Sequence, residues 1–422
     1  MTISLHSSTS TPAIAIVGNY PPRQCGIATF THDLRMALDQ LGPDTRCLAI
    51  AVQDALGPYD YAPGAVMVEI DQEDPATYIA AAERINRTGI QAVSLQHEFG
   101  IFGGRAGEHV LELLRRVHAP VTTTLHTVLT HPDAEQRRVM EGLIARSHRL
   151  VVMAEKGRQI LSDTYAVPFD RIELIPHGIP DEPLLAASAA KSALGVDGRQ
   201  VLLTFGLLSP NKGIEVMIEA LPAIARRHPD IVYLVVGATH PNLRRHEGER
   251  YRDSLQQRAD ALGVGHNVRF VDRYLELPQL LDFIAAADIY ITPYLSEAQI
   301  TSGTLAYAFG LGKPVVSSPY WYARELLGDQ RGLLVPFGHI DGFARAVNLL
   351  LGDSILRQQL EARADAIGRG MRWSSVARRY RQLLLPGTSN APDLKTPVAH
   401  GRHQRCPTGA EESRTLRLPL AS

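Results

Sequence analysis

Short runs of apolar and β-branched residues alternate with longer helical patterns along most of this chain, and this alternation constrains the fold more than any other feature. Early apolar runs are AIAIVG (13–18), TRCLAIAV (45–52) and AVSLQHE (92–98), with helical patterns such as residues 28–42 between them. Strands that alternate with helices form a parallel sheet that carries helices on both faces. The pattern therefore predicts a doubly wound α/β fold.

The alternation occurs twice, which predicts two domains. A second series of apolar runs begins with QVLLTFG at 200–206, after a segment from Pro180 to Arg199 that carries no strand signal and is expected to be a linker. The chain of 422 residues also exceeds the roughly 250 to 300 residues that one hydrophobic core serves. We place the first domain at 1–180 and the second at 181–371. The polar segment 387–422, punctuated by Pro and Gly, is expected to be a disordered tail.

Composition excludes several classes of protein. Hydrophobic residues make up 45% of the chain and charged residues 21%, as in a folded soluble protein. With 43 basic and 44 acidic residues, the net charge of -1 provides no field that would hold nucleic acid. The cysteines form neither a disulfide framework nor a metal-ligand pattern, and the N-terminus lacks a secretory signal. We expect a cytoplasmic protein without a membrane span, while peripheral membrane contact through a helix face stays open.

The first motif is GNYPPRQCGIATF (18–30), in which a strand is predicted to end at Gly18 and a helix to begin near Gly26. Glycine lets a ligand approach the backbone closely, and the first turn of a helix presents unpaired N–H groups with a partial positive charge. An anionic ligand is therefore expected at Gly26. The alternative is a simple strand-to-helix turn.

Two histidines stand where predicted parallel strands end. His97 and Glu98 close one apolar run, and His126 follows the next, within TLHT. Open α/β sheets place their ligand sites at the carboxyl ends of the strands. Both histidines are therefore candidate site residues, and the alternative for each is a hydrogen-bonded structural histidine.

Two further loops are suited to phosphate. In TFGLLSPNKGIEV (204–216), Lys212 stands at the start of a predicted helix, so that an ammonium and a helix N-terminus would together stabilise developing negative charge. A later predicted helix opens with small residues whose backbone N–H groups suit phosphate oxygens. The alternative for this later group is that it only caps the helix. Its members are Thr301, Ser302, Gly303 and Thr304.

Taken together, these motifs resemble the retaining family 4 glycosyltransferases, over about Ala13 to Leu385 and most strongly from Val201 to Leu327. The resemblance implies the GT-B architecture, in which two Rossmann-like domains face a central cleft. The first domain would bind the acceptor, and the second would bind a nucleotide-sugar donor. The helical stretch 372–386 resembles the C-terminal helix that crosses back onto the first domain in this architecture.

The family pattern then implies roles for the candidate residues. His126 matches the histidine beside the donor sugar, and Lys212 matches a cation that stabilises the leaving diphosphate, so both are expected to be catalytic. His97 and Glu98 would face the acceptor. The phosphates and base of the donor would be held by residues of both domains, namely Gly26, Gly206, Arg273, Tyr274, Thr301, Ser302, Gly303 and Thr304.

The sequence departs from the family pattern in two places. Leu207 stands where an arginine usually follows the glycine, so one cation of the usual pair is missing. The family also has two glutamates, one that meets the donor sugar and one that meets the ribose. Counting forward from Pro293 puts Glu297 at the first position, whereas counting back along the following helix puts Gln299 and Tyr307 at the two positions. Glu297 and Gln299 are therefore catalytic candidates, and Tyr307 is a candidate for donor binding.

The resemblance implies retaining transfer of a hexose, mannose or glucose, from a GDP- or UDP-sugar to a sugar, polysaccharide or lipid-linked acceptor. No Asp-x-Asp motif follows a strand of the first domain, so we expect metal-independent transfer without a cofactor. The positive charge would come from Lys212 and from helix N-termini. Two alternatives stay open: a phosphorylase on the same scaffold that uses inorganic phosphate, and a binding protein descended from a transferase.

Overall fold

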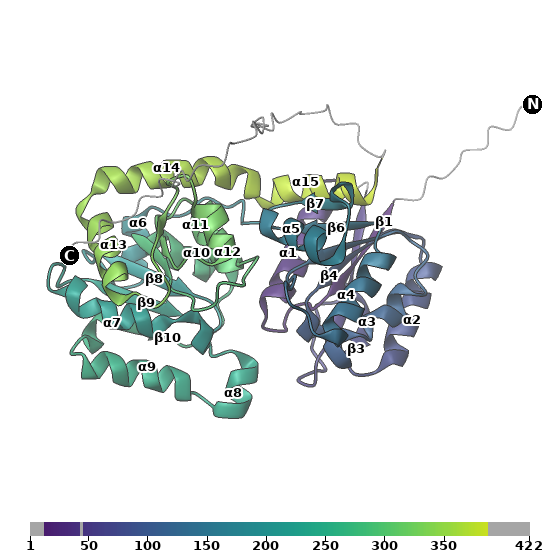
Figure 1. Cartoon of the computed structure of the whole chain (residues 1–422), viewed down its shortest axis with the longest axis horizontal. Coiled ribbons are helices and arrows are strands. Elements are labelled where there is room, and N and C mark those ends of the chain that lie inside the picture. The colour runs from purple at the N-terminus through teal and green to yellow at the C-terminus, as the bar shows by residue number, and fades with distance from the viewer. Residues whose placement is uncertain (1–11, 43–44, 387–422) are drawn as a thin grey trace, which may run out of the picture.

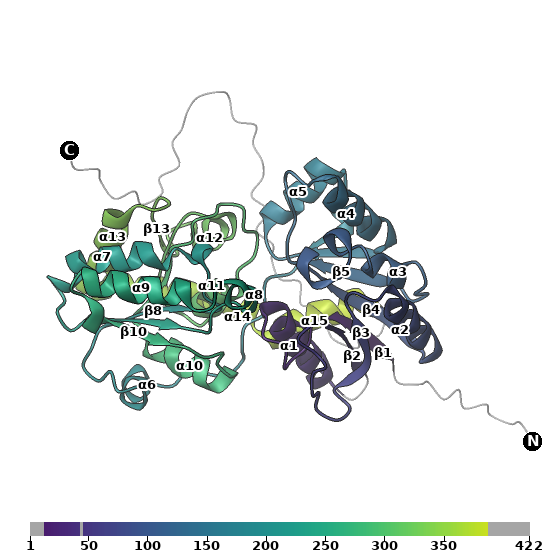
Figure 2. The same cartoon turned by 90° about the horizontal axis from the view of Figure 1, so that it is seen from below.

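The computed structural model describes residues 12–42 and 45–386. Two α/β domains lie side by side, each built on one parallel sheet with helices on both faces (Figure 1, Figure 2). The doubly wound α/β fold predicted from the alternation of apolar runs is therefore confirmed. The predicted tail, 387–422, lies outside the described residues.

The first sheet has the strand order β3-β2-β1-β4-β5-β6-β7, and its neighbouring strands are all parallel. Its strands are β1 (Ala13–Gly18), β2 (Arg46–Gln53), β3 (Val66–Asp71), β4 (Ile90–His97), β5 (Val121–Leu125), β6 (Arg149–Val152) and β7 (Ile172–Leu174). The helices of this domain are α1 (Gly26–Gln40), α2 (Pro75–Arg87), α3 (Val110–Leu114), α4 (Ala134–Arg146) and α5 (Glu155–Tyr165).

The second sheet has the order β10-β9-β8-β11-β12-β13 and is also parallel. Its strands are β8 (Val201–Phe205), β9 (Val232–Val236), β10 (Val268–Val271), β11 (Ile289–Thr292), β12 (Val315–Ser317) and β13 (Leu333–Leu334). The helices around it are α6 (Ala187–Ala193), α7 (Ile214–Ala225), α8 (Pro241–Glu247), α9 (Arg250–Ala261), α10 (Leu277–Ala286), α11 (Gly303–Gly310), α12 (Trp321–Leu327) and α13 (Ile340–Gly352).

Two final helices and several short 3₁₀ turns complete the described chain. The final helices are α14 (Ser354–Met371) and α15 (Trp373–Leu384). The 3₁₀ turns are η1 (Phe99–Ile101), η2 (Arg105–Gly107), η3 (Phe169–Arg171), η4 (Pro210–Lys212) and η5 (Gly265–Asn267). Among the helices of the described residues, none is both long and apolar enough to cross a bilayer.

Alternate residues of each central strand enter different cores on the two faces of the sheet. In β1, Ile14 and Ile16 pack in a core with α1 and α15, whereas Ala15 and Val17 pack in a core with α2, α3 and α4. A strand that is buried on both faces must be apolar throughout, because its side chains point alternately to either side. This is why AIAIVG reads as a continuous apolar run.

The last two helices return the chain from the second domain to the first. In Figure 1, α14 runs along the second domain and α15 continues onto the first, where it packs on α1. The chain therefore crosses between the domains twice, near Ile179 and near Trp373. These two crossings are hydrogen-bonded to each other, because Ile179 N–H donates to Met371 O (2.8 Å) and Trp373 N–H donates to Ile179 O (2.9 Å). Gly178 lies under the Trp373 ring, where a Cβ atom would come within 2.3 Å of the ring.

The segment 180–199 is more than the linker expected from its sequence. Its second half contains α6, which packs on α10 through Ala190, Ala285 and Ala286. That expectation is therefore wrong for the second half, which folds as part of the second domain. A short alanine-rich helix gives no periodic apolar signal, since small side chains suffice where two helices lie close together.

The order of strands reverses at one point in each sheet, between β1 and β4 and between β8 and β11. Ligands of open α/β sheets bind outside the carboxyl ends of the strands at such points. The residues that follow these four strand ends therefore deserve first consideration as site residues. They include Asn19, Glu98, Gly206 and Pro293.

Candidate active site

Lys212 lies in the loop between β8 and α7, against the loop that follows β11. Gly213 has a left-handed backbone (φ 62°), and a Cβ atom there would lie 2.2 Å from the carbonyl oxygen of Pro293. Only glycine lets the two loops pack this closely. As a result, Lys212 Nζ donates a hydrogen bond to the hydroxyl of Tyr294 (2.9 Å) and lies 4.1 Å from the centroid of its ring.

The hydroxyl of Tyr294 joins Lys212 to the first turn of α11. It lies 3.0 Å from Thr304 Oγ1, and the Tyr294 ring is buried and stacked on Tyr320 with centroids 5.0 Å apart. Ser302 caps the helix, because its Oγ accepts from Leu305 N–H (3.3 Å). The two loops that the sequence suggested for phosphate therefore meet, and they set an ammonium beside a helix N-terminus.

The packing of α11 against its neighbours depends on two glycines. At Gly206 (φ 115°) a Cβ atom would lie 2.9 Å from Thr304 Cγ2, and at Gly303 it would lie 2.9 Å from His177 Nε2. Both positions thus lack a side chain because α11 begins against the end of β8 on one side and against His177 on the other.

The first turn of α1 is open where Gly26 lies. Cys25 caps the helix, with its Sγ accepting from Ala28 N–H (3.2 Å), and Gly26 is exposed, with no atom within 4 Å of the position of a Cβ. The nearby Arg23 is held by Asn19 Oδ1 (2.9 Å) and pairs with the carboxylate of Asp54 (3.3 Å). The fold itself does not require a glycine at this helix start.

Helix α1 also connects the two domains. Thr29 Oγ1 lies 2.8 Å from the hydroxyl of Tyr274, and one turn later Asp33 Oδ2 accepts from the hydroxyl of Tyr307 (2.8 Å). Figure 2 shows α1 at the junction of the two domains. The first turn of α1 is therefore on the same side of the helix as its contacts with the second domain, since Gly26, Thr29 and Asp33 follow helical spacing.

His126 lies directly after β5 and is 6% exposed. Its Nε2 lies 3.1 Å from Gln96 Oε1, and the edge of its ring meets Phe30 with centroids 4.8 Å apart. Burial, assisted by the charges of His177 and His97, lowers the pKa of His126 to about 3. The imidazole is thus neutral at pH 7, and it carries its hydrogen on Nε2 because Gln96 Oε1 can only accept.

Two family descriptions match this chain, one in each domain. "Glycosyltransferase Family 4" matches residues 25–183, and "Glycosyl transferases group 1" matches residues 199–353. The chain belongs to the family 4 glycosyltransferases. The family suggested by the sequence motifs is therefore confirmed.

Several curated relatives are named for inositol compounds, and one is named as a lipopolysaccharide core biosynthesis glycosyltransferase. The phosphatidyl-myo-inositol mannosyltransferase of Mycolicibacterium smegmatis is 29% identical over 271 residues, which cover 63% of this chain and only 64% of that relative. The D-inositol 3-phosphate glycosyltransferase of Frankia alni is 27% identical over 405 residues, which cover 86% of this chain and 95% of that relative.

Solved glycosyltransferase structures share the fold. A glycosyltransferase from Rickettsia africae has a TM-score of 0.70 at 15% identity, covering 88% of this chain and 97% of that one. HepE from Anabaena, solved in complex with UDP and glucose, has a TM-score of 0.68 at 16% identity, covering 88% and 99%. These likenesses show that the family 4 chain described here has the predicted GT-B fold.

The two glutamate positions of family 4 are occupied unusually in this member. Glu297 is exposed and pairs with Arg324 on α12 (2.9 Å), while the Gln299 amide donates back to its own loop (2.9 Å). Tyr307 is buried in α11 and bonds to Asp33. The carboxylate that contacts α11 is therefore that of Asp33, which belongs to α1 of the first domain. Roles for these residues in catalysis or donor binding stay predictions.

His97 and Glu98, the predicted acceptor residues, differ in exposure, because His97 is fully buried while Glu98 is half-buried. His97 is 0% exposed, lies between the rings of Phe99 and Phe102, and has no hydrogen-bond partner among the described residues for either ring nitrogen. Burial lowers the pKa of His97 to about 3. Glu98 accepts from Thr127 Oγ1 (2.6 Å) and from Phe99 N–H (3.0 Å), and burial raises its pKa. The structure therefore puts His97 in the core, not on a surface that an acceptor reaches.

Arg273, predicted to lie near the nucleotide base, is exposed in the loop after β10 and forms no ion pair within the described residues. Its neighbour Tyr274 is the residue that contacts α1. Within the same part of the chain, no group of three or more His, Cys, Asp or Glu side chains is placed to hold a metal ion. Metal-independent transfer remains a prediction.

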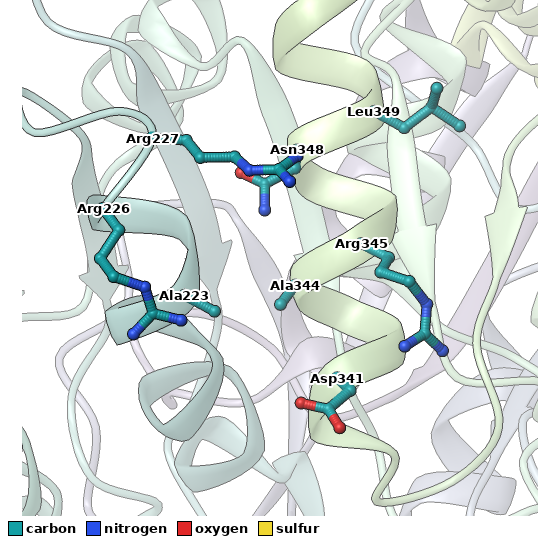
Figure 3. Close-up of a pocket in the computed structure, with 8 residues that line it drawn as sticks. All are labelled: Ala223, Arg226, Arg227, Asp341, Ala344, Arg345, Asn348 and Leu349. Carbon is teal, nitrogen blue, oxygen red and sulfur yellow. The ribbon is translucent and has the colours of Figure 1, made fainter. Parts of the chain in front are cut away.

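Two surface hollows lie apart from the Lys212 site. One lies between α7 and α13 (Figure 3), toward the C-terminal end of α7, whereas Lys212 precedes its N-terminal end. The other lies beside α1 in the first domain. The first is lined by Ala223, Arg226, Arg227, Asp341, Ala344, Arg345, Asn348 and Leu349, and the second by Tyr20, Pro21, His32, Arg35, Met36, Ala62, Pro63, Gly64 and Ala65.

Sequence reasoning missed two residues of the site. Tyr294 comes almost directly after β11, so the rule that strand ends carry ligand sites could have found it. Asp33 lies in the middle of α1, where a polar residue is usually a solvated one, and no sequence signal distinguishes it. Only the placement of the second domain against α1 gives Asp33 its partner.

Proposed function

We propose that this chain transfers a hexose from a nucleotide diphosphate sugar to an acceptor, with retention of the anomeric configuration. The observation that carries the proposal is the contact chain from Lys212 through Tyr294 to Thr304. A departing diphosphate gains negative charge as the glycosidic bond breaks. An ammonium and the N–H groups of a helix start, fixed in advance, stabilise that charge without having to reorganise.

In the reaction that this arrangement supports, the acceptor oxygen bonds to the anomeric carbon while the bond from that carbon to the diphosphate breaks. The departing phosphate takes the proton of the acceptor on the same face, which gives retention. Neutral His126 donates its one hydrogen to Gln96 Oε1, which leaves Nδ1 to accept from a sugar hydroxyl; it would position the sugar and would not act as the nucleophile. Glu297, the nearest glutamate of the family pattern, is engaged with Arg324.

Donor and acceptor classes rest on the relatives. The Anabaena protein was solved with UDP and glucose, and the mycobacterial relatives are named as mannosyltransferases. A UDP- or GDP-activated glucose or mannose is therefore the proposed donor. Because two relatives are named for phosphatidyl-myo-inositol and for D-inositol 3-phosphate, the proposed acceptor is a phosphorylated polyol, either free or linked to a lipid.

A donor panel tests the proposal. The purified full chain is incubated with UDP- and GDP-hexoses in the presence of myo-inositol phosphates, and nucleotide release is measured together with the anomeric configuration of the product by NMR. Lys212→Ala is expected to lower kcat by about 100-fold or more, because it removes the ammonium that meets the leaving group. Arg226→Ala, which removes an exposed cation elsewhere in the same domain, serves as the matched control.

The same panel separates the alternatives. Turnover that depends on inorganic phosphate and needs no nucleotide would support the phosphorylase, and binding without any turnover would support a binding protein. Full activity in Lys212→Ala would refute the assignment of the phosphate site.

A further inference from the structure

Tyr294 holds the two halves of the proposed phosphate site together. It follows β11 at the point where the strand order of the second sheet reverses, and it is 2% exposed. Ser318 Oγ donates to its carbonyl oxygen (2.5 Å), and the ring of Tyr320 lies nearly parallel to its own ring (17°). The ring is therefore fixed, and the only freedom left to the side chain is the direction of its hydroxyl hydrogen.

One hydrogen bond at this hydroxyl has a direction that chemistry fixes. The ammonium of Lys212 has donors and no acceptor, so the Tyr294 oxygen must accept from it (2.9 Å). In the contact with Thr304 Oγ1 (3.0 Å) either hydroxyl can be the donor. When Tyr294 donates, Thr304 accepts this bond and keeps its own hydrogen for another acceptor.

Ser302 Oγ is a weak alternative acceptor for Thr304. It lies 3.3 Å away, beyond the usual range for O–H···O bonds, and it already accepts from Leu305 N–H. Each donor in such a chain polarises the next, and the chain begins at a full positive charge. The Thr304 hydroxyl is thus a strengthened donor at the start of α11.

Leu207 stands where the family pattern has an arginine, and the contacts from Lys212 to Thr304 suggest what takes the place of that cation. We infer that Tyr294 is a positioning residue of the transfer reaction: it anchors Lys212 and directs the Thr304 hydroxyl outward, so that a departing diphosphate meets an ammonium and a polarised hydroxyl together. The inference rests on the proposed function and names the part of the site that compensates for Leu207. The pKa of Tyr294 agrees with the contact to Lys212: burial alone would raise it, but the charge of Lys212 lowers it.

Replacing Tyr294 by phenylalanine tests the inference, because the ring and its stacking stay while the hydroxyl is lost. Tyr294→Phe is expected to lower kcat about 10- to 100-fold, the effect of losing a charge-assisted hydrogen bond. By isothermal titration calorimetry, its affinity for UDP or GDP should fall, whereas its affinity for uridine or guanosine should not change. A purely structural role for Tyr294 would not separate the diphosphates from the nucleosides.

Four further variants, two controls and two tests, complete the experiment. Tyr320→Phe removes a hydroxyl from the neighbouring buried ring without touching Lys212, and it should leave kcat unchanged. Thr304→Ser keeps the oxygen and should retain activity, whereas Thr304→Val should lose about as much as Tyr294→Phe. Since both substitutions interrupt the same chain, the double variant Tyr294→Phe/Thr304→Val should lose little more than either single one.

The outcomes distinguish the inference from the function on which it rests. If the unaltered protein binds neither UDP nor GDP and turns over no donor, the proposed function fails and the inference falls with it. If that protein is active but Tyr294→Phe and Thr304→Val keep its kcat and its preference for diphosphates, only the inference is overturned. Equal losses in Tyr294→Phe and Tyr320→Phe would also overturn it, because they would indicate general damage to the core.

Discussion

Gly26 allows a test of whether the start of α1 meets a ligand. A Cβ atom at Gly26 would meet no atom of the described residues. Gly26→Ala should therefore leave the melting temperature unchanged or raise it slightly, because alanine stabilises a helix by up to about 1 kcal/mol relative to glycine. If the donor diphosphate lies over this turn, the added methyl group obstructs it, and the donor KM should rise. Gly370→Ala in α14 is a matched control, because its Cβ position is equally open. An unchanged donor KM in Gly26→Ala would exclude contact at this turn.

The buried histidines predict how stability depends on pH. Burial lowers the pKa of His97 and of His126 to about 3, whereas an unfolded histidine titrates near 6.5. Below pH 6.5 the unfolded chain therefore binds protons that the folded protein does not, and the stability present at neutral pH is lost as the pH falls. Each histidine should lower the free energy of unfolding by about 2 kcal/mol at pH 5, relative to its value at neutral pH.

Urea unfolding at pH 8, 6 and 5 measures this loss. His97→Leu should make the unfolding free energy less dependent on pH, because it removes a group that titrates only in the unfolded chain. The variant should still fold, since His97 has no hydrogen-bond partner to lose among the described residues. His246→Gln, which alters an exposed histidine, is the control and should follow the unaltered protein. Identical slopes for His97→Leu and the unaltered protein would contradict the prediction.

At the scale of elements, the sequence was most informative where an element is buried on both faces. The nearly continuous apolar runs at β1, β8 and β9 predict a parallel sheet, because only a strand covered on both sides needs apolar residues on both faces. Element α6 was read as linker, since its small alanines pack closely without a periodic apolar pattern. The helix expected to begin near Lys212 begins at Ile214 instead, because η4 and Gly213 intervene.

The site was less predictable than the fold, because its contacts join elements far apart in the sequence. The loop motifs identified Lys212 and Thr304 separately, and the side chain that joins them, Tyr294, belongs to a third element. The strand-end rule placed His97 and His126 alike. Their contacts separate them, since the side chain of His97 meets two phenylalanine rings and has no hydrogen-bond partner among the described residues, while that of His126 bonds to Gln96.

In the whole molecule, the contacts between the two domains differ from one side of the junction to the other. On one side the backbone pairs at Ile179 and Trp373, and α15 packs on α1. Elsewhere the domains meet through apolar side chains, with Ile300 and Trp321 packed against the core of the first domain, and through polar contacts. The Glu325 carboxylate, for example, accepts from Glu155 N–H (2.7 Å) and Lys156 N–H (3.3 Å) at the start of α5. This arrangement favours rotation of one domain relative to the other about the crossings at Ile179 and Trp373. The contacts on the other side would break and form again during that rotation.

The two hydrogen bonds from α1 predict how easily the domains separate. Tyr307→Phe removes the bond to Asp33, and Tyr274→Phe removes the bond to Thr29. A hydrogen bond to a charged group contributes about 1.5–3 kcal/mol, so the double variant should shift the balance between closed and open forms by at least about tenfold. Small-angle X-ray scattering should then show a larger radius of gyration without a loss of helix content.

Tyr380→Phe provides the control for this experiment. It removes a buried bond between two neutral hydroxyls, Tyr380 and Thr124, of the same kind as the bond from Tyr274 to Thr29, but within the contact of α15 with the first domain, where the radius of gyration should not respond. If loops of both domains hold a nucleoside diphosphate, as proposed, a saturating concentration of UDP or GDP should return the double variant toward the compact form. Scattering curves that coincide for the double variant and the unaltered protein would show that these two bonds do not hold the domains together.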